Sequence, residues 1–217
     1  MAHRCPNKSY QLLIVIITFL FFTTHAHASL INSDFSNGFD GWKGYLEIEN
    51  FVTGDFAFED DLDPSTYPSN FSLLPNGIKL TPSEDGDDLA FVVGLYQDFT
   101  FGPLAANTRK ILSLSSVPFL GDVDANDPDF SDFFDIFLFN ETRGETRSLI
   151  SGGDFDITDW AGDSLILEFF VGDVAGDINS SLALSNITLF DKINEVPEPQ
   201  VFGLAILAML LMRIKRT

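Results

Sequence analysis

Hydrophobic residues between positions 29 and 195 come in short runs that Gly, Pro, Asn and Asp interrupt. No stretch repeats its apolar positions with a helical period over the length of a helix, so the pattern indicates an all-β chain. The runs predict strands at residues 44–52, 77–80, 89–101, 110–117, 132–139, 147–150, 164–172 and 181–190. The acid-rich stretches 59–63, 84–88 and 122–129 are expected to be loops.

The last predicted strand, 181–190, shows the clearest alternation. One of its faces is expected to carry Leu182, Leu184, Asn186, Thr188 and Phe190, and the other Ala183, Ser185, Ile187 and Leu189. Because neither face is purely polar, we expect this strand to be covered on both sides.

The number and spacing of these strands predict the fold class. About eight short strands, in a chain with 23 phenylalanines, favour two antiparallel sheets packed on an aromatic core. We therefore predict an all-β jelly-roll sandwich. Residues 29–195 are enough for one domain with a proper core.

The first 28 residues have the features of a secretory signal peptide. Arg4 and Lys8 precede the apolar run 11–22, and the small residues Ala26 and Ala28 follow it. This order predicts cleavage by signal peptidase after Ala28, leaving Ser29 as the new N-terminus. The alternative is an uncleaved membrane anchor.

Removal of residues 1–28 would restrict the chemistry of the mature chain. The single cysteine, Cys5, and the three histidines, His3, His25 and His27, all lie in this segment. A mature chain without Cys or His has no disulfide, no thiolate nucleophile, no histidine-based triad and no Cys or His zinc site.

The remaining chain is strongly acidic. Residues 29–195 contain seven basic and 31 acidic side chains, a net charge of −24. Such a surface repels nucleic acid and anionic membranes and attracts divalent cations. Solubility alone is an alternative explanation of this charge.

The composition of the chain changes again at Val196, after the segments 1–28 and 29–195. Val196, Pro197, Glu198 and Pro199 precede an apolar run at 201–212, and the basic residues Arg213, Lys215 and Arg216 follow it. The prolines end the preceding strand, and the basic end favours the cytoplasmic side of a membrane. The apolar run is shorter than the ~20 residues of a full span, so a helix docked on the protein is an alternative.

This C-terminal tail resembles the PEP-CTERM sorting signal, a Val-Pro-Glu-Pro box followed by a short apolar helix and an Arg-rich end. The resemblance covers residues 196–217, with Lys215 interrupting the Arg cluster. It implies recognition by an exosortase, a membrane-anchored precursor with a short transmembrane helix, and delivery to the cell envelope, cell surface or extracellular matrix of a bacterium.

The opening of the mature chain, 30–42, is similar to that of galactose-binding-like and carbohydrate-binding jelly rolls. In those families an Asn and a Phe precede a Gly turn and a Trp, here Trp42, which we expect in the core. The segment 182–189 is similar to their closing strand, although Ser185 stands where an Asp is common. The resemblance implies a sandwich used for glycan or calcium binding.

Two sets of residues are candidates for ligand binding. Trp160, in a loop-like stretch, and Tyr67, beside prolines, are the candidate glycan platforms, with simple packing as the alternative. Alternating oxygen-bearing side chains suggest a calcium loop at Asp122, Asp124, Asn126, Asp127 and Asp129. The EF-hand pattern is absent, and a solvated acidic loop is the alternative.

We therefore expect an exported, non-enzymatic glycan-binding module, with calcium as a possible cofactor and extracellular polysaccharide as the partner. The first alternative is a structural matrix protein without a discrete ligand. The second is a glycan hydrolase that uses two carboxylates, with Glu47, Glu49, Glu141 and Glu168 among the candidates. Alternation points Glu168 toward solvent.

Overall fold

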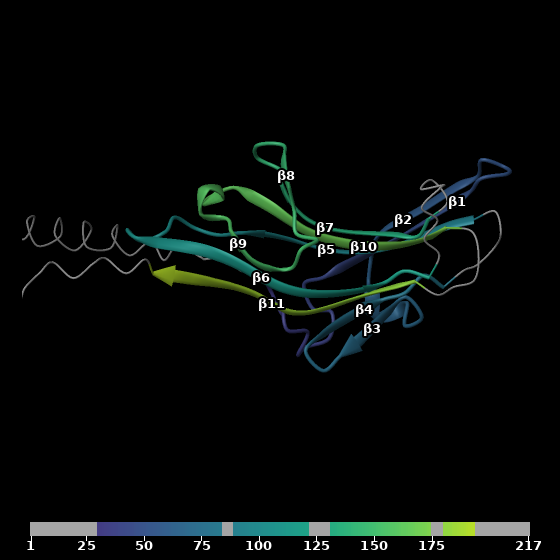
Figure 1. The fold of residues 1–217 in the computed structure, drawn as a ribbon, viewed down its shortest axis with the longest axis horizontal. Coiled ribbons are helices and arrows are strands. Elements are labelled where there is room, and N and C mark those ends of the chain that lie inside the picture. Colours follow the sequence, from purple (N-terminus) through teal and green to yellow (C-terminus); the bar gives the residue numbers. More distant parts are fainter. Residues whose placement is uncertain (1–29, 84–88, 122–130, 175–179, 194–217) are drawn as a thin grey trace, which may run out of the picture.

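The computed structural model describes residues 30–83, 89–121, 131–174 and 180–193. These residues form two antiparallel sheets that lie face to face, as Figure 1 shows. The predicted two-sheet antiparallel sandwich is therefore confirmed. The helical segments in the described part of the chain are three-residue turns, η1 (Pro64–Thr66) and η3 (Thr158–Trp160), and no helix there is long and apolar enough to cross a membrane.

The first sheet has six strands and the second has five. The first runs in the order β2 (Phe56–Leu62), β1 (Lys43–Asn50), β5 (Leu89–Thr100), β10 (Ser164–Val174), β7 (Phe133–Asn140) and β8 (Glu145–Ser148). The second runs in the order β3 (Phe71–Leu74), β4 (Gly77–Leu80), β11 (Ser181–Ile193), β6 (Thr108–Phe119) and β9 (Gly153–Asp156).

The core lies between the sheets and follows from strand alternation. In β10, Leu165, Leu167, Phe169 and Val171 are fully buried, whereas the alternating residues Ile166, Glu168 and Phe170 face outward. The facing strands of the second sheet contribute Leu112, Leu114, Leu182 and Leu184. One continuous hydrophobic core therefore joins the two sheets.

Three strands were missed by the sequence analysis, and all three are at sheet edges. β2, β3 and β9 each pair with a neighbouring strand on one side only, so much of their surface is exposed. Their sequences therefore show no clear alternation of apolar and polar residues. The prediction that 59–63 is a loop is wrong, because most of it belongs to β2. Backbone pairing with β1 holds these acidic residues in a strand.

The face assignment of the last strand was correct only for its first half. Leu182 and Leu184 are buried as predicted, but the register with β6 shifts between Ser185 and Thr188, and Asn186 takes a positive φ of 55°. This bulge turns Ile187 into the core and Asn186 out to solvent. The expectation that both faces are covered is also wrong, because the outward residues of β11 are at most half-buried.

The segment before β1 is held by a network of side chains. Trp42 is 4% exposed, stacks on Phe35 with ring centroids 5.1 Å apart, and lies 5.3 Å from the ring of Phe169, which confirms it as a core residue. The buried Gln97 on β5 donates to the backbone oxygens of Ile31 and Gly41 and accepts from the amide of Ile31. These contacts fix the start of the described chain against the first sheet.

Candidate ligand-binding face

Aromatic side chains gather on the outer face of the first sheet, the face turned away from the core. Strand alternation and pairing place there Phe56, Phe58, Tyr45, Tyr96, Phe170, Phe133, Phe137 and Phe139. These rings come from five of the six strands. Because the strands pair side by side, residues far apart in the sequence become neighbours on this face.

A hollow of about 550 Å³ opens on this face over β2, β1, β5 and β10. It is lined by three aromatic rings, one aliphatic side chain and four carboxylates: Tyr45, Phe58, Tyr96, Ile166, Glu47, Asp60, Asp98 and Glu168. Its volume falls within the range of small-ligand sites in proteins. We call it the face hollow.

The ring of Tyr45 is in contact with the other two rings of the face hollow. The ring centroid of Tyr45 lies 5.8 Å from that of Phe58 and 6.5 Å from that of Tyr96. Tyr45 is 8% exposed and forms the floor, whereas Phe58 is 51% exposed and forms a wall. Ring contacts at these distances stabilise the arrangement beyond simple burial.

Gly94 makes room for the floor of the hollow. It pairs with Tyr45 across β1 and β5, and a Cβ placed on Gly94 would lie 2.0 Å from Cζ of Tyr45. The tyrosine ring therefore lies flat over the glycine, as aromatic residues often do over glycines in sheets. Gly172 has the same relation to Phe133, whose ring atoms would lie 2.5 Å from its Cβ.

The two tyrosine hydroxyls of the hollow donate to carboxylates. Tyr45 Oη donates to Glu168 Oε1 at 2.9 Å, and Tyr96 Oη donates to Asp60 Oδ1 at 3.1 Å. Burial is the largest cause that raises the pKa of both hydroxyls above its ordinary value, and the hydrogen bonds to the carboxylates and the neighbouring negative charges raise it further. Both tyrosines therefore remain protonated at neutral pH.

Glu168 occupies the centre of the outer face. Strand pairing places it between Tyr96 on β5 and Phe137 on β7. Burial raises the pKa of Glu168, the hydrogen bond from Tyr45 lowers it, and the charges of Asp60 and Asp135 raise it further, with a net increase. The prediction that Glu168 points away from the core is confirmed, although its side chain is half-buried by the surrounding rings.

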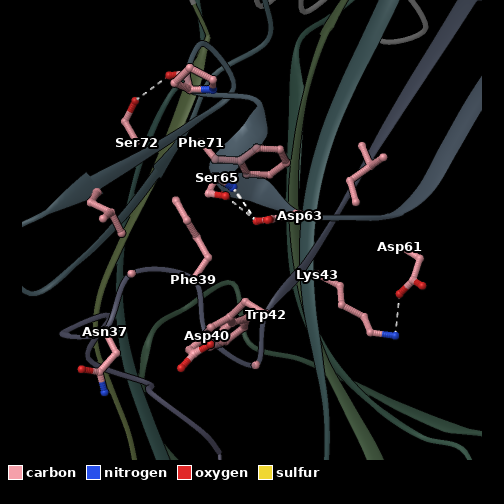
Figure 2. A pocket seen from close by; sticks show the side chains of 15 residues that line it. Asn37, Phe39, Asp40, Trp42, Lys43, Asp61, Asp63, Ser65, Phe71 and Ser72 are labelled. Atoms are coloured by element: carbon pink, nitrogen blue, oxygen red, sulfur yellow. Dashed lines mark hydrogen bonds and ion pairs between the residues drawn. The ribbon is translucent and has the colours of Figure 1, made fainter.

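A second hollow, of about 930 Å³, lies between the segment before β1 and the η1 and β3 region. Figure 2 shows this hollow, with the side chains of Phe39, Trp42 and Phe71 on one side and the Lys43–Asp61 ion pair on the other. The two hollows adjoin through Lys43, whose Nζ lies 2.6 Å from Asp61 Oδ1 and 5.9 Å from the ring of Tyr96.

Several aromatic and acidic groups of this second hollow are engaged in local structure. Trp42 and Phe71 are almost fully buried, so their ring faces are not available to a ligand. Asp63 accepts from the amide of Ser65 and caps η1, and Asp61 is paired with Lys43. The face hollow, with its exposed ring and central carboxylate, is therefore the better candidate site.

A buried carboxylate outside both hollows has a structural role. Asp132 accepts hydrogen bonds from the amides of Val174 and Gly121 and from the hydroxyl of Ser180, at 2.9, 3.1 and 2.5 Å. It thereby joins the ends of β6 and β10 to the start of β11 and compensates its own burial.

Comparison with known proteins gives no family. No family model and no curated protein sequence matches this chain. One similar solved structure is TmCBM61 in complex with beta-1,4-galactotriose, at 14% identity and a TM-score of 0.33, over 77% of this chain and 100% of that chain. Another is a xylanase 10C mutant from Cellvibrio japonicus in complex with xylopentaose, at 9% identity and a TM-score of 0.28.

The second comparison covers 73% of this chain but only 28% of the xylanase chain. At such TM-scores neither likeness supports a conclusion about the ligand of this chain.

The prediction that Trp160 is an exposed platform is wrong. Trp160 is 0% exposed, its Nε1 donates to Glu145 Oε2 at 3.2 Å, and the guanidinium of Arg147 lies 3.9 Å from its ring centroid. The reason is that η3 turns the indole into the core, where its polar atom Nε1 has a hydrogen-bond partner. The loop-like sequence around Trp160 gives no sign of this burial.

Tyr67 lies elsewhere than in the face hollow. It packs half-buried against the core, and its hydroxyl donates to Glu59 Oε2 at 3.1 Å. It lines a small hollow of about 290 Å³ on the other side of β2, together with Asn70 and Phe91. The structure does not bring Tyr67 together with Trp160, and binding of a glycan by Tyr67 stays a prediction.

The predicted calcium and processing residues lie outside the described residues. These are Asp122, Asp124, Asn126, Asp127 and Asp129, and also Ala26, Ala28, Ser29, Val196, Pro197, Glu198, Pro199, Arg213, Lys215 and Arg216. Within the described ranges, no three or more His, Cys, Asp or Glu side chains are grouped so as to hold a metal ion.

Sequence reasoning missed most of the face hollow. Phe58 and Asp60 were missed because β2 was not recognised as a strand, and Tyr45 and Tyr96 because their alignment across β1 and β5 is a tertiary feature. Glu47 and Glu168 were named, but only as possible members of an unassigned carboxylate pair. The available signal was that aromatic residues occupy positions that strand alternation turns away from the core, where polar residues are expected.

Proposed function

We propose that this protein is an exported glycan-binding module whose ligand occupies the face hollow. The observation that carries the proposal is the combination of Phe58, Tyr45 and Tyr96 in ring contact with carboxylates on a sheet face that is open to solvent. A sugar ring has an apolar C–H face that packs on an aromatic ring and a polar rim of hydroxyls that donates to carboxylates. The face hollow offers both types of partner.

The position of the site also supports binding rather than packing. Large exposed aromatic residues are unfavourable on a soluble surface unless they meet a partner. Phe58, the wall of the face hollow, is 51% exposed on the edge strand β2. The acidic side chains around it keep this edge soluble and limit pairing with another chain.

Export and sorting are the second part of the proposal. Basic and apolar residues followed by Ala26 and Ala28 support cleavage by signal peptidase before Ser29. The tail 196–217 supports recognition by an exosortase and a membrane-anchored precursor at the cell envelope. The module would then act at the cell surface or in the extracellular matrix of a bacterium, with calcium at 122–129 as a further ligand to titrate.

A matched pair of variants tests glycan binding. The full-length chain, held in a polyoxyethylene detergent because sugar-based detergents would compete, is screened on a glycan array, and hits are measured by calorimetry. We expect Phe58→Ala to weaken binding about tenfold or more, equivalent to about 1.4 kcal/mol. Phe56→Ala, on the same strand and face but outside the hollow, should have a much smaller effect.

Either of two results would contradict the proposal. One is the absence of any glycan hit with the folded chain, and the other is equal weakening by Phe58→Ala and Phe56→Ala. The structural matrix protein without a discrete ligand would then be the better account.

The second candidate function, hydrolysis, is favoured by one observation. Glu168 is half-buried, has a raised pKa, and shares the hollow with Glu47, Asp60 and Asp98, as a general acid and its partner would. Release of reducing sugar from a bound oligosaccharide, abolished by Glu168→Gln, would establish it. Binding without release would leave the non-catalytic module.

A further inference from the structure

The polar groups of the face hollow are hydrogen-bond acceptors. Four carboxylates line it, Glu47, Asp60, Asp98 and Glu168, and ionised carboxylates only accept. The hydroxyl hydrogens of Tyr45 and Tyr96 are already donated to two of these carboxylates. A ligand in this hollow must therefore bring the donors itself.

The hollow is also uniformly negative. None of its lining residues is basic. The nearest described cation is Lys43, whose Nζ is 2.6 Å from Asp61 Oδ1 and therefore already has an anionic partner. Glu49 on β1 and Asp135 on β7 add negative charge to the same face. Such a surface favours cationic ligands and repels anionic ones.

A metal ion is a poor match for this charge. Within the described residues no group of three or more acidic side chains is arranged to hold one ion, so these carboxylates do not converge on one point. They are spread around a hollow of about 550 Å³ with aromatic walls. Aromatic faces with dispersed carboxylates suit an organic cation, because the ring faces attract ammonium groups and the carboxylates accept their hydrogens.

We infer that the ligand of the face hollow is a glycan with free amino groups, a polymer of hexosamine. This inference rests on the proposed glycan-binding function and specifies its ligand class. An amino sugar keeps the apolar ring face that packs on Phe58 and Tyr96, and its ammonium group supplies donors and positive charge. N-acetylation removes that charge, and uronic or sulfated sugars reverse it.

Three trimers of the same linkage distinguish the possibilities: a glucosamine trimer, its N-acetylated counterpart and a glucose trimer. Their affinities for the full-length chain are measured by calorimetry at a pH where the amino groups are charged. We expect the glucosamine trimer to bind at least about tenfold more tightly than the other two. Added salt should weaken its binding selectively.

Charge-neutralising variants locate the effect. Glu47→Gln and Glu168→Gln should each weaken binding of the glucosamine trimer several-fold, by removing a carboxylate that lines the hollow. Glu49→Gln is the matched control, because Glu49 lies on the same strand and outer face as Glu47 but outside the hollow. Two neutralised positions are used so that a folding defect in one variant leaves the other informative.

The outcomes separate this inference from the proposed function. If the glucose or N-acetylated trimer binds as tightly as the glucosamine trimer and Phe58→Ala weakens it, the module binds neutral glycans and the inference is wrong. If Glu47→Gln and Glu49→Gln weaken glucosamine binding equally, the attraction comes from the net charge of the chain, and the inference is also wrong. If no trimer and no arrayed glycan binds, the proposed function fails as well.

Discussion

The outer faces of the two sheets differ in kind although the same alternation builds both. The first sheet presents aromatic rings and carboxylates over β2, β1, β5 and β10, and these enclose a hollow. On the second sheet, the middle of the outer face over β6 and β11 carries short side chains, Ser113, Ser115, Ala183, Ser185 and Thr188, whereas Val117, Phe119 and Phe190 are exposed toward its ends. Short side chains at the middle of a face do not wall a hollow, so the combination of aromatic rings and carboxylates around the face hollow belongs to the first sheet.

A glycine in each sheet allows a close approach, but of a different group: an aromatic side chain in the first sheet and a backbone in the second. In the first sheet Gly94 lies beneath the ring of Tyr45, so the missing side chain creates a place for an aromatic floor. In the second sheet a Cβ on Gly77 would lie 1.9 Å from the carbonyl oxygen of Leu184, so glycine there permits close approach of two backbones. Gly94 therefore shapes the floor of the face hollow, whereas Gly77 only allows two strands of the second sheet to lie close together.

The largest expected effect comes from filling the space under the floor of the hollow. Gly94→Ala would place a methyl group 2.0 Å from Cζ of Tyr45, so the ring must move. We expect a loss of about 2–3 kcal/mol in the free energy of unfolding and loss of glycan binding. Urea unfolding and calorimetry measure the two effects.

A double-mutant cycle checks the cause of that effect. In a Tyr45→Ala background the clash is absent, so Gly94→Ala should destabilise much less than in the wild type. Equal destabilisation in both backgrounds would mean that the glycine acts on the backbone and not on the ring.

A smaller, pH-dependent effect is expected at Glu168. Burial raises its pKa above the ordinary value of 4.5, so the folded state binds this proton more tightly than the unfolded state. The stabilising contribution of protonated Glu168 is therefore present below pH 4.5 and is lost as the pH rises through the raised pKa. Glu168→Gln should remove this dependence, so that its stability relative to wild type increases with pH.

Unfolding at a series of pH values measures this difference. Glu49→Gln removes the same charge from the same face outside the hollow, so comparison of the two variants isolates the contribution of the half-buried site. Parallel stability curves for wild type and Glu168→Gln would contradict the raised pKa.

The smallest effect is expected on the other sheet. Ser115 is exposed on β6 and pairs with Ser185 on β11. Ser115→Ala should change the free energy of unfolding by less than about 0.5 kcal/mol, and it should leave glycan affinity unchanged. A clear loss of affinity would show that the second sheet carries a site too and would remove the contrast between the faces.

The interior strands were predictable, and most of the edge strands were not. The predicted strand 77–80 matches β4 and 89–101 differs from β5 by one residue, because buried strands show continuous or alternating apolar residues. β2, β3 and β9 pair on one side only and carry polar residues where an interior strand would be apolar. Their backbone pairing, which hydrophobicity does not report, decides their structure.

The candidate site was predictable only in part. That Glu168 faces away from the core follows from alternation in an apolar strand, and its position in β10 confirms this. That it meets the hydroxyl of Tyr45, which is 123 positions away in the sequence, follows from the order of strands β1, β5 and β10. The same order brings Phe58 to one wall of the hollow, whereas the choice of Trp160 failed because a loop-like sequence does not reveal burial.

By itself the sequence determined the all-β class, the strongly acidic surface and the position of Trp42 in the core, because these depend on composition and local alternation. Only the tertiary structure decided which outward residues become neighbours, because that depends on strand order and register rather than on sequence distance. The face hollow results from this strand order and register. Six of its lining residues come from β1 and β2, which are adjacent along the chain, or from β10, and Tyr96 and Asp98 come from β5, which lies between β1 and β10 in the sheet.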